Sequence, residues 1–179
     1  MPQRFLADDG LCLCLLGPDG AALGAQKAAH LNLDYREYRL LRDEEIHPFD
    51  TPFGKAALLV DADCCMPHAA RAAVLAGAEI LLMSQFIQPY DFFEDRLTLG
   101  PVSAARSNGV PVVASVGGYG VVCAPDGACT ASPFEESPVF ARVTPCGVKE
   151  ALRAPMREAL AVLRAHRAAV CATGGKDDA

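Results

Sequence analysis

The sequence predicts an α/β fold built on a parallel strand–helix–strand unit, and three observations support this prediction. A continuous apolar run at residues 56–60 has the length of a strand that is buried on both faces. Pro67 then opens an alanine-rich stretch that ends at Gly77, which matches the residues preferred at the start and just past the end of a helix. A second apolar run at residues 78–83 follows directly. This order predicts two parallel strands joined by a right-handed crossover.

Upstream of this unit the sequence predicts a β-hairpin and a charged connection. The apolar run 11–16 is followed by a Gly-Pro-Asp-Gly turn at 17–20, and strand-like residues resume at 21–25. The stretch 34–45 is highly charged and carries apolar residues at helical spacing. We expect it to be a surface helix or an ordered loop.

Downstream of the unit the strand and turn signals continue without a linker-like stretch, so we predict one domain over residues 1–171. The further elements are a helix at 92–107, a strand at 110–116, a tight glycine-rich turn at 117–120, a hairpin turn at 125–127, a last strand at 139–143, a helical region at 147–171 interrupted before Pro155, and a flexible tail at 172–179.

The composition is that of an ordinary globular protein with an acidic balance. Of 179 residues, 51% are hydrophobic and 21% are charged, and the formal net charge is −6, so nucleic acid and anionic membranes are not expected as main partners. The first residues lack the apolar region of a secretory signal, and no apolar run reaches the ~20 residues of a membrane helix. We therefore expect a cytoplasmic protein whose eight cysteines are reduced thiols, several of them buried.

The segment 56–77 has the pattern of a nucleophile elbow, a sharp strand-to-helix turn that holds one side chain at the exposed end of a buried strand. The N-terminus of the following helix and nearby backbone N–H groups can then stabilise developing negative charge. The tip of this turn falls within residues 61–65, which read Asp-Ala-Asp-Cys-Cys. The segment therefore predicts an enzyme-like site that lacks an obvious nucleophile at its tip.

Around this elbow the sequence resembles the carbon–nitrogen hydrolase superfamily of nitrilases and amidases. Four pieces carry the resemblance in the family's order: a hairpin and loop at 15–31, the elbow segment at 50–81, a strand preceded by Asn108, and a hairpin at 117–127. Within the elbow segment the matching residues are Asp50, Thr51, Phe53, Gly54, Lys55, Asp63, Pro67, Arg71 and 77–81. The resemblance implies a partial α–β–β–α sandwich of the nitrilase type, in which two stacked sheets carry helices outside and the N-terminal half of the family fold is absent.

The resemblance also implies a cysteine nucleophile assisted by a lysine and a glutamate, and this sequence departs from that set. In the register that Pro67 and Asp63 fix, the nucleophile position is Asp61. The lysine position is Ala28, with Lys27 one place early, and a supporting glutamate is matched by Glu37. Two further glutamate positions are occupied by Ser107 and His68.

Several interpretations of the elbow stay open. Cys64 or Cys65 can be a displaced nucleophile activated by the helix N-terminus, although a shift of three residues moves a side chain about 5 Å along a helix. Both cysteines can equally be plain thiols packed under the turn. Asp61 and Asp63 can serve a metal-dependent phosphoryl reaction, or can cap the following helix.

The leading hypothesis is a carbon–nitrogen hydrolase-like protein that is catalytically impaired or inactive and acts as a binding or assembly subunit, because the three catalytic roles are missing together. An active amidohydrolase that uses Cys64 or Cys65, and a metal-dependent enzyme that uses Asp61 and Asp63, are the alternatives. We expect a homodimer or a partner subunit to cover the open sheet face. A small amide or nitrile is the expected ligand, and no cofactor or metal is expected.

Overall fold

The computed structural model describes residues 3–7, 10–31, 42–43, 45–85, 94–132 and 137–147, with six further positions between 157 and 165. These six positions are helical, as the sequence predicts for that region. Glu37, most of the charged stretch 34–45 and the predicted tail at 172–179 lie outside the described residues.

A six-stranded mixed sheet forms the centre of the fold, with the strand order β4-β5-β6-β7-β8-β9. The strands are β4 (Phe49–Thr51), β5 (Gly54–Val60), β6 (Ile80–Gln85), β7 (Val112–Val116), β8 (Tyr119–Cys123) and β9 (Cys129–Ala131). The β5–β6 and β6–β7 pairs are parallel, whereas the outer pairs are antiparallel. Helix α2 (Pro67–Leu75) connects β5 to β6, and α3 (Glu94–Asn108) precedes β7. The predicted strand–helix–strand unit and the α/β fold class are confirmed.

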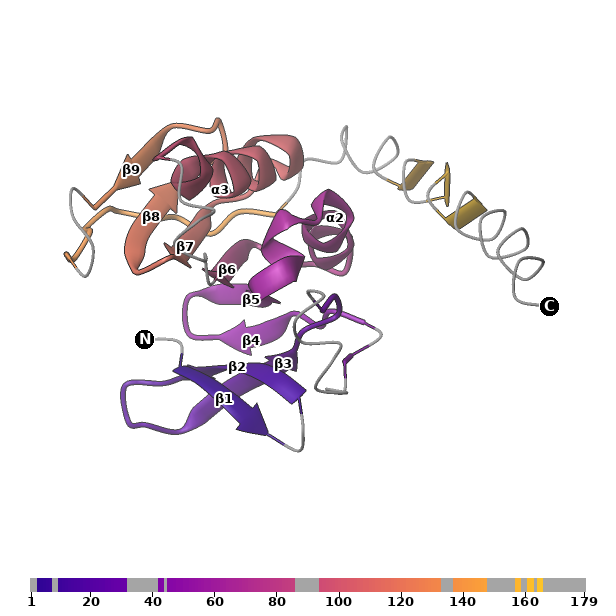
Figure 1. Ribbon diagram of the computed structural model, residues 1–179, viewed down its shortest axis with the longest axis horizontal. Coiled ribbons are helices and arrows are strands. Elements are labelled where there is room, and N and C mark those ends of the chain that lie inside the picture. Colours follow the sequence, from indigo (N-terminus) through magenta and orange to yellow (C-terminus); the bar gives the residue numbers. More distant parts are fainter. Residues whose placement is uncertain are drawn as a thin grey trace.

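A second, three-stranded antiparallel sheet has the order β1-β2-β3. Its strands are β1 (Gln3–Ala7), β2 (Gly10–Leu16) and β3 (Ala22–Lys27). The β2–β3 pair is the hairpin that the sequence predicts around the turn at 17–20. Figure 1 shows this sheet beside β4 and β5, and α2 and α3 together on one side of the six-stranded sheet.

Side chains along each strand of the large sheet alternate between two cores, because successive residues of a strand point to opposite faces. One core contains Leu59 of β5, Leu81 of β6 and Val112 of β7, and it is covered by α2 and α3. The other contains Leu58 and Val60 of β5 and packs against Leu11, Leu13 and Leu15 of β2. Strand β5 is therefore buried on both faces, as its continuous apolar run predicts.

The glycine-rich turn between β7 and β8 is also confirmed. Gly117 and Gly118 have φ values of 55° and 90°, and β8 returns antiparallel to β7. Only glycine adopts two successive positive φ values without steric cost, and such turns match the twist of the strands they join.

The prediction of a strand at residues 139–143 is wrong. These residues have no regular secondary structure, because the edge of β8 is already paired with β9 and the segment crosses the sheet face instead. The Cγ1 atom of Val139 lies against Gly120 of β8, in space that a side chain at position 120 would need. The apolar residues of this segment therefore contact a sheet face and do not pair with a neighbouring strand.

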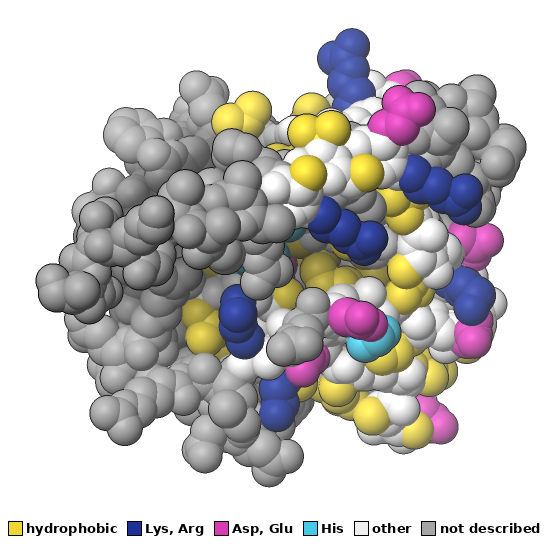
Figure 2. Space-filling view, turned by 90° about the vertical axis from the view of Figure 1, so that its right-hand side faces the viewer, with side chains coloured by type: hydrophobic (Ala, Val, Ile, Leu, Met, Phe, Trp, Pro, Cys, Tyr) yellow, Lys and Arg dark blue, Asp and Glu magenta, His cyan; other side chains and the backbone are white. Residues whose placement is uncertain are grey.

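The described surface carries mixed charge. Figure 2 shows Lys and Arg side chains interspersed with Asp and Glu on the face that it presents, with no continuous basic patch among its described residues. No helix in the described part of the chain is both long enough and apolar enough to cross a membrane. The seven described cysteines are free thiols, of which Cys12, Cys64 and Cys123 are buried.

Candidate active site

The elbow has the sharp strand-to-helix turn that the sequence predicts, but the residue at its tip is buried and not exposed. Strand β5 ends at Val60, and the next residue, Asp61, has a φ of 49° and is 2% exposed. It is the only non-glycine residue with a positive φ among those the structure describes. A short 3₁₀ helix over Asp61–Cys65 follows and leads into α2 at Pro67. A non-glycine residue in this sparsely populated backbone region marks a tight turn, and such residues cluster at functional sites.

Asp63 joins the elbow to the smaller sheet and does not cap a helix. Its fully buried carboxylate accepts hydrogen bonds from the backbone N–H groups of Ala29 (3.0 Å) and His30 (2.8 Å), just past the end of β3. The 3₁₀ helix and α2 begin without a capping hydrogen bond from the side chain of the preceding residue, which is Met66 for α2. The capping interpretation is therefore wrong for Asp63, because a carboxylate in the middle of the 3₁₀ helix faces the neighbouring loop.

Two histidines extend this contact into a hydrogen-bonded chain. The Nδ1 atom of His30 lies 2.7 Å from an oxygen of Asp63. On its other side, Nε2 of His30 lies 2.9 Å from Nε2 of His68, which belongs to the first turn of α2. The imidazole rings meet edge to face, with centroids 4.7 Å apart. Burial, followed by the effect of His30, lowers the pKa of His68 below its usual value, whereas Asp63 acts in the opposite direction.

The two elbow cysteines lie in different surroundings. Cys64 is 6% exposed, and its thiol donates to the backbone carbonyl of Leu59 at 3.4 Å. Burial and, after it, the negative charge of Asp63 raise the pKa of Cys64 far above its usual value, so the reactive thiolate is suppressed. Cys65 is exposed, and its sulfur accepts a hydrogen bond from Nε2 of Gln85 at 2.8 Å.

The other positions that the family pattern singles out make hydrogen bonds between the elements around the elbow. Ala28, at the lysine position, is fully buried, and its backbone N–H donates to the carbonyl of Leu11. Arg71 of α2 donates through Nε to the side chain of Asn108 (2.7 Å) and through a terminal nitrogen to the carbonyl of Ser107 (3.0 Å). These bonds tie α2 to the end of α3.

The arrangement can hold and move a proton, because a buried carboxylate orients one imidazole and a second imidazole continues the chain. No group of three or more His, Cys, Asp or Glu side chains within the described ranges is arranged to hold a metal ion. Both oxygens of Asp63 already accept N–H groups, so this carboxylate is not placed to serve the metal-dependent alternative.

The His30–His68 contact was not found from the sequence. The sequence singles out His68 at a glutamate position of the family pattern, but that pattern does not join His68 to His30. The two are 38 positions apart and meet because Asp63 holds the loop after β3 against the start of α2. One signal in the sequence could have indicated this contact. His30 follows the predicted hairpin and His68 follows the elbow, so both histidines lie near the ends of elements that the fold brings together.

Together the mixed sheet, the two covering helices and the elbow define an α/β fold of the nitrilase type. The carbon–nitrogen hydrolase from Helicobacter pylori G27 superposes with a TM-score of 0.57 at 22% identity, over 67% of this chain and 51% of that chain. Saccharomyces cerevisiae Nit3, a nitrilase-superfamily member, gives a TM-score of 0.60 at 20% identity, over 70% and 49%. A mutant of the amidase from Nesterenkonia sp. AN1 gives 0.63 at 17% identity, over 92% and 66%.

These similarities establish the fold, and at 22% identity or less they do not establish a shared activity. The chain spans about half the length of the first two solved structures that it matches. No protein-family model matches the sequence, and no curated protein matches it. The nitrilase-type relationship expected from the sequence is confirmed at the level of the fold, and the activity of this chain depends on its own residues.

Proposed function

We propose that this chain is a carbon–nitrogen hydrolase-like protein that does not hydrolyse amides or nitriles through a thiol and instead serves as a binding or assembly subunit. The observation that carries the proposal is the elbow itself. Its strained turn is retained, but the residue with positive φ directly after β5 is Asp61, where the resemblance implies a cysteine. The amidase from Nesterenkonia sp. AN1, by contrast, forms an acrylamide adduct at its active-site cysteine.

Chemistry at the tip supports the loss of hydrolysis. A carboxylate that attacked an amide would form an anhydride, which is higher in energy than a thioester, and carboxylate is the weaker nucleophile. No amine supports such an attack from position 28, because Ala28 is fully buried and carries only a methyl group. Two of the family's three roles are thus filled by residues that cannot perform them.

Cys64 does not restore the nucleophile. Its thiol is buried, it is held by the carbonyl of Leu59, and the neighbouring carboxylates oppose formation of the thiolate. Its position three residues after the tip also displaces the sulfur from the place that the nucleophile would occupy. Catalytic geometry tolerates displacements of only about 1 Å.

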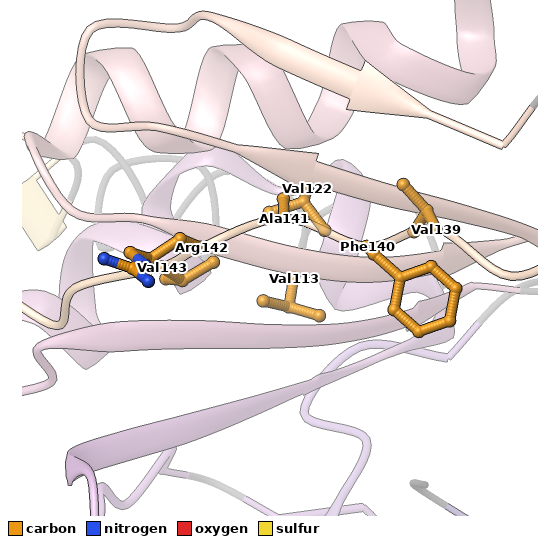
Figure 3. Close-up of a pocket in the computed structure, with 7 residues that line it drawn as sticks. All are labelled: Val113, Val122, Val139, Phe140, Ala141, Arg142 and Val143. Atoms are coloured by element: carbon orange, nitrogen blue, oxygen red, sulfur yellow. The ribbon is translucent and has the colours of Figure 1, made fainter.

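The assembly role is supported by the sheet face that α2 and α3 do not cover. Leu82, Val113 and Val122 lie on this face and are only partly buried. Residues 139–143 run across this face and, with Val113 and Val122, line an open groove of about 580 Å³. Phe140 in this segment is 87% exposed. Figure 3 shows the lining residues, which are Val113, Val122, Val139, Phe140, Ala141, Arg142 and Val143. An apolar surface of this kind supports a covering partner, either a second copy of the chain or another subunit.

Ammonia release from a panel of amides, nitriles and carbamoyl compounds tests the proposal. We expect no turnover above background from the folded chain, and the same result from a Cys64→Ala/Cys65→Ala variant. Turnover by the wild type that disappears in the variant would contradict the proposal and show that the thiols do the chemistry. Circular dichroism of both proteins verifies that an inactive sample is folded.

Cys65 supports a second candidate, an active cysteine-dependent amidohydrolase. It is exposed at the elbow and accepts a hydrogen bond from Gln85, which is an orientation suited to a working thiol. Under this candidate, Cys65→Ser alone abolishes ammonia release and Cys64→Ser leaves it unchanged. Equal rates in both variants would exclude Cys65 as the nucleophile.

A further inference from the structure

We propose that His30 and His68 form a binding site for one divalent transition-metal ion, with both Nε2 atoms as ligands and the Asp63 carboxylate as the support behind His30. This site uses neither Asp61 nor a thiol. It does not depend on whether the chain hydrolyses amides, so its test stands apart from the test of the proposed function.

The relative placement of the two rings fits a shared ion. Their Nε2 atoms are 2.9 Å apart and their centroids are 4.7 Å apart. Two rings aimed straight at each other would have centroids separated by the nitrogen–nitrogen distance plus two ring radii, which is more than is observed. The ring axes are therefore bent away from the line that joins the nitrogens, as they are when two imidazoles bind one ion.

The distance also indicates which ions fit. An ion placed about 2.0–2.1 Å from each nitrogen would subtend an N–ion–N angle of about 90° across this gap. Such an angle matches neighbouring positions of the square-planar or octahedral sites that Cu²⁺ and Ni²⁺ prefer. A tetrahedral Zn²⁺ site needs the nitrogens several tenths of an ångström further apart, so zinc is expected to bind with a small opening of the pair.

Asp63 prepares His30 for this role. Its carboxylate accepts from Nδ1 of His30 at 2.7 Å and also holds the backbone N–H of the same residue. A proton on Nδ1 leaves the lone pair of Nε2 pointing away from Asp63, toward His68. A carboxylate behind a metal-binding histidine fixes its tautomer and orientation and makes the nitrogen a stronger ligand. The buried negative charge also favours a cation at this place.

Both imidazoles can be reached from solvent, and they are the two protein ligands of the proposed site. The side chain of His30 is 33% exposed, and His68 is partly buried on the first turn of α2, so an ion can reach both nitrogens from solvent. Since no third His, Cys, Asp or Glu joins them in the described part of the chain, water or a bound small molecule would fill the remaining positions. A site with two protein ligands therefore leaves positions at which an exogenous ligand can bind the ion.

Metal titration of the full chain tests the proposal. The protein is treated with EDTA, exchanged into metal-free buffer with a non-chelating reductant, and titrated with NiCl₂ or ZnCl₂ by calorimetry. We expect one saturable site per chain for Ni²⁺ and a weaker one for Zn²⁺, because the observed nitrogen–nitrogen distance suits an angle of about 90° at the ion. The affinity is expected to fall at least about ten-fold in His68→Gln and in His30→Gln.

Matched controls separate this site from adventitious binding. His47→Gln removes a histidine that is exposed elsewhere on the surface, and Cys65→Ser removes the exposed elbow thiol. Both are expected to bind as tightly as the wild type. If His30→Gln fails to fold, His68→Gln decides alone, since its side chain lies at the surface end of the chain of contacts. Absence of saturable binding to the wild type, or unchanged binding in His68→Gln, would overturn the proposal.

Discussion

The two faces of the six-stranded sheet differ in how completely this chain covers them. On one face, Leu81 of β6 and Val112 of β7 are fully buried under α2 and α3. On the other face, the adjacent residues Leu82 and Val113 of the same strands remain partly exposed. Neighbours in sequence thus have different environments, although both are large and apolar. Among the described residues, the core under the helices is therefore closed, whereas the opposite core is fully buried near β5 and partly exposed over β6, β7 and β8.

On the opposite face, burial decreases from β5 toward β8. Strand pairing places Leu58, Leu82, Val113 and Val122 in one row across the sheet. Leu58 lies under the smaller sheet and is fully buried, but the remaining three are partly exposed. The cover ends where the three-stranded sheet ends, since that sheet contacts β4 and β5. The part of this face over β7 and β8 is the surface that residues 139–143 cross.

Truncation of neighbouring leucines on β6 gives the largest expected contrast. Leu81→Ala removes a side chain with no exposed surface and leaves a cavity in the closed core, so we expect a loss of about 3–4 kcal/mol in the free energy of unfolding. Leu82→Ala, on the partly open face, should cost about 1–2 kcal/mol. Urea denaturation measures both. Equal losses would show that the second face is as closed as the first in solution.

Removal of the charge on Asp63 should have the next largest effect, because this carboxylate joins the two sheets. In Asp63→Asn the new NH₂ group faces N–H donors of Ala29 or His30, and a charge-assisted bond is lost, so we expect about 2 kcal/mol of destabilisation. Asp50→Asn is the matched control, since its carboxylate is 86% exposed and pairs with Lys55 at the surface. That change should alter stability by less than about 0.5 kcal/mol. A loss as small as the control's would remove Asp63 as the link between the sheets.

The sequence predicts most of this fold because periodicity reports burial. Residues 56–60 are apolar without interruption, and β5 is the strand that is covered on both sides. Pro67 and Gly77 bracket a helix because each suits one end of it, and Gly117 and Gly118 predict a hairpin because both need positive φ. Each of these signals acts within a few residues, which is the range over which a sequence specifies its own local structure.

The site could be predicted only in part, because its contacts join distant positions. The place of the elbow follows from a strand signal next to a helix signal, but the role of Asp63 depends on the loop after β3. Its sequence context favours a helix cap, yet its carboxylate lies nearer to the N–H groups of Ala29 and His30. Residues 139–143 show the same limit. Val139 of this apolar run packs against the sheet, but whether such a segment pairs with an edge or lies across a face depends on strands that are distant in sequence.

Replacement of Phe140 should have the smallest effect on the free energy of unfolding, and it tests most directly whether the partly exposed sheet face takes part in self-association. Its side chain is 87% exposed, so Phe140→Ser should change the free energy of unfolding by less than about 0.5 kcal/mol. If a second copy covers this face, the wild type self-associates and Phe140→Ser shifts the equilibrium toward monomer, as measured by analytical ultracentrifugation over a range of concentrations. Leu99→Ser, at a 65% exposed position of α3, is the matched control and should leave the association unchanged. A monomeric wild type, or equal effects of the two substitutions, would mean that a second copy does not close the face over β7 and β8.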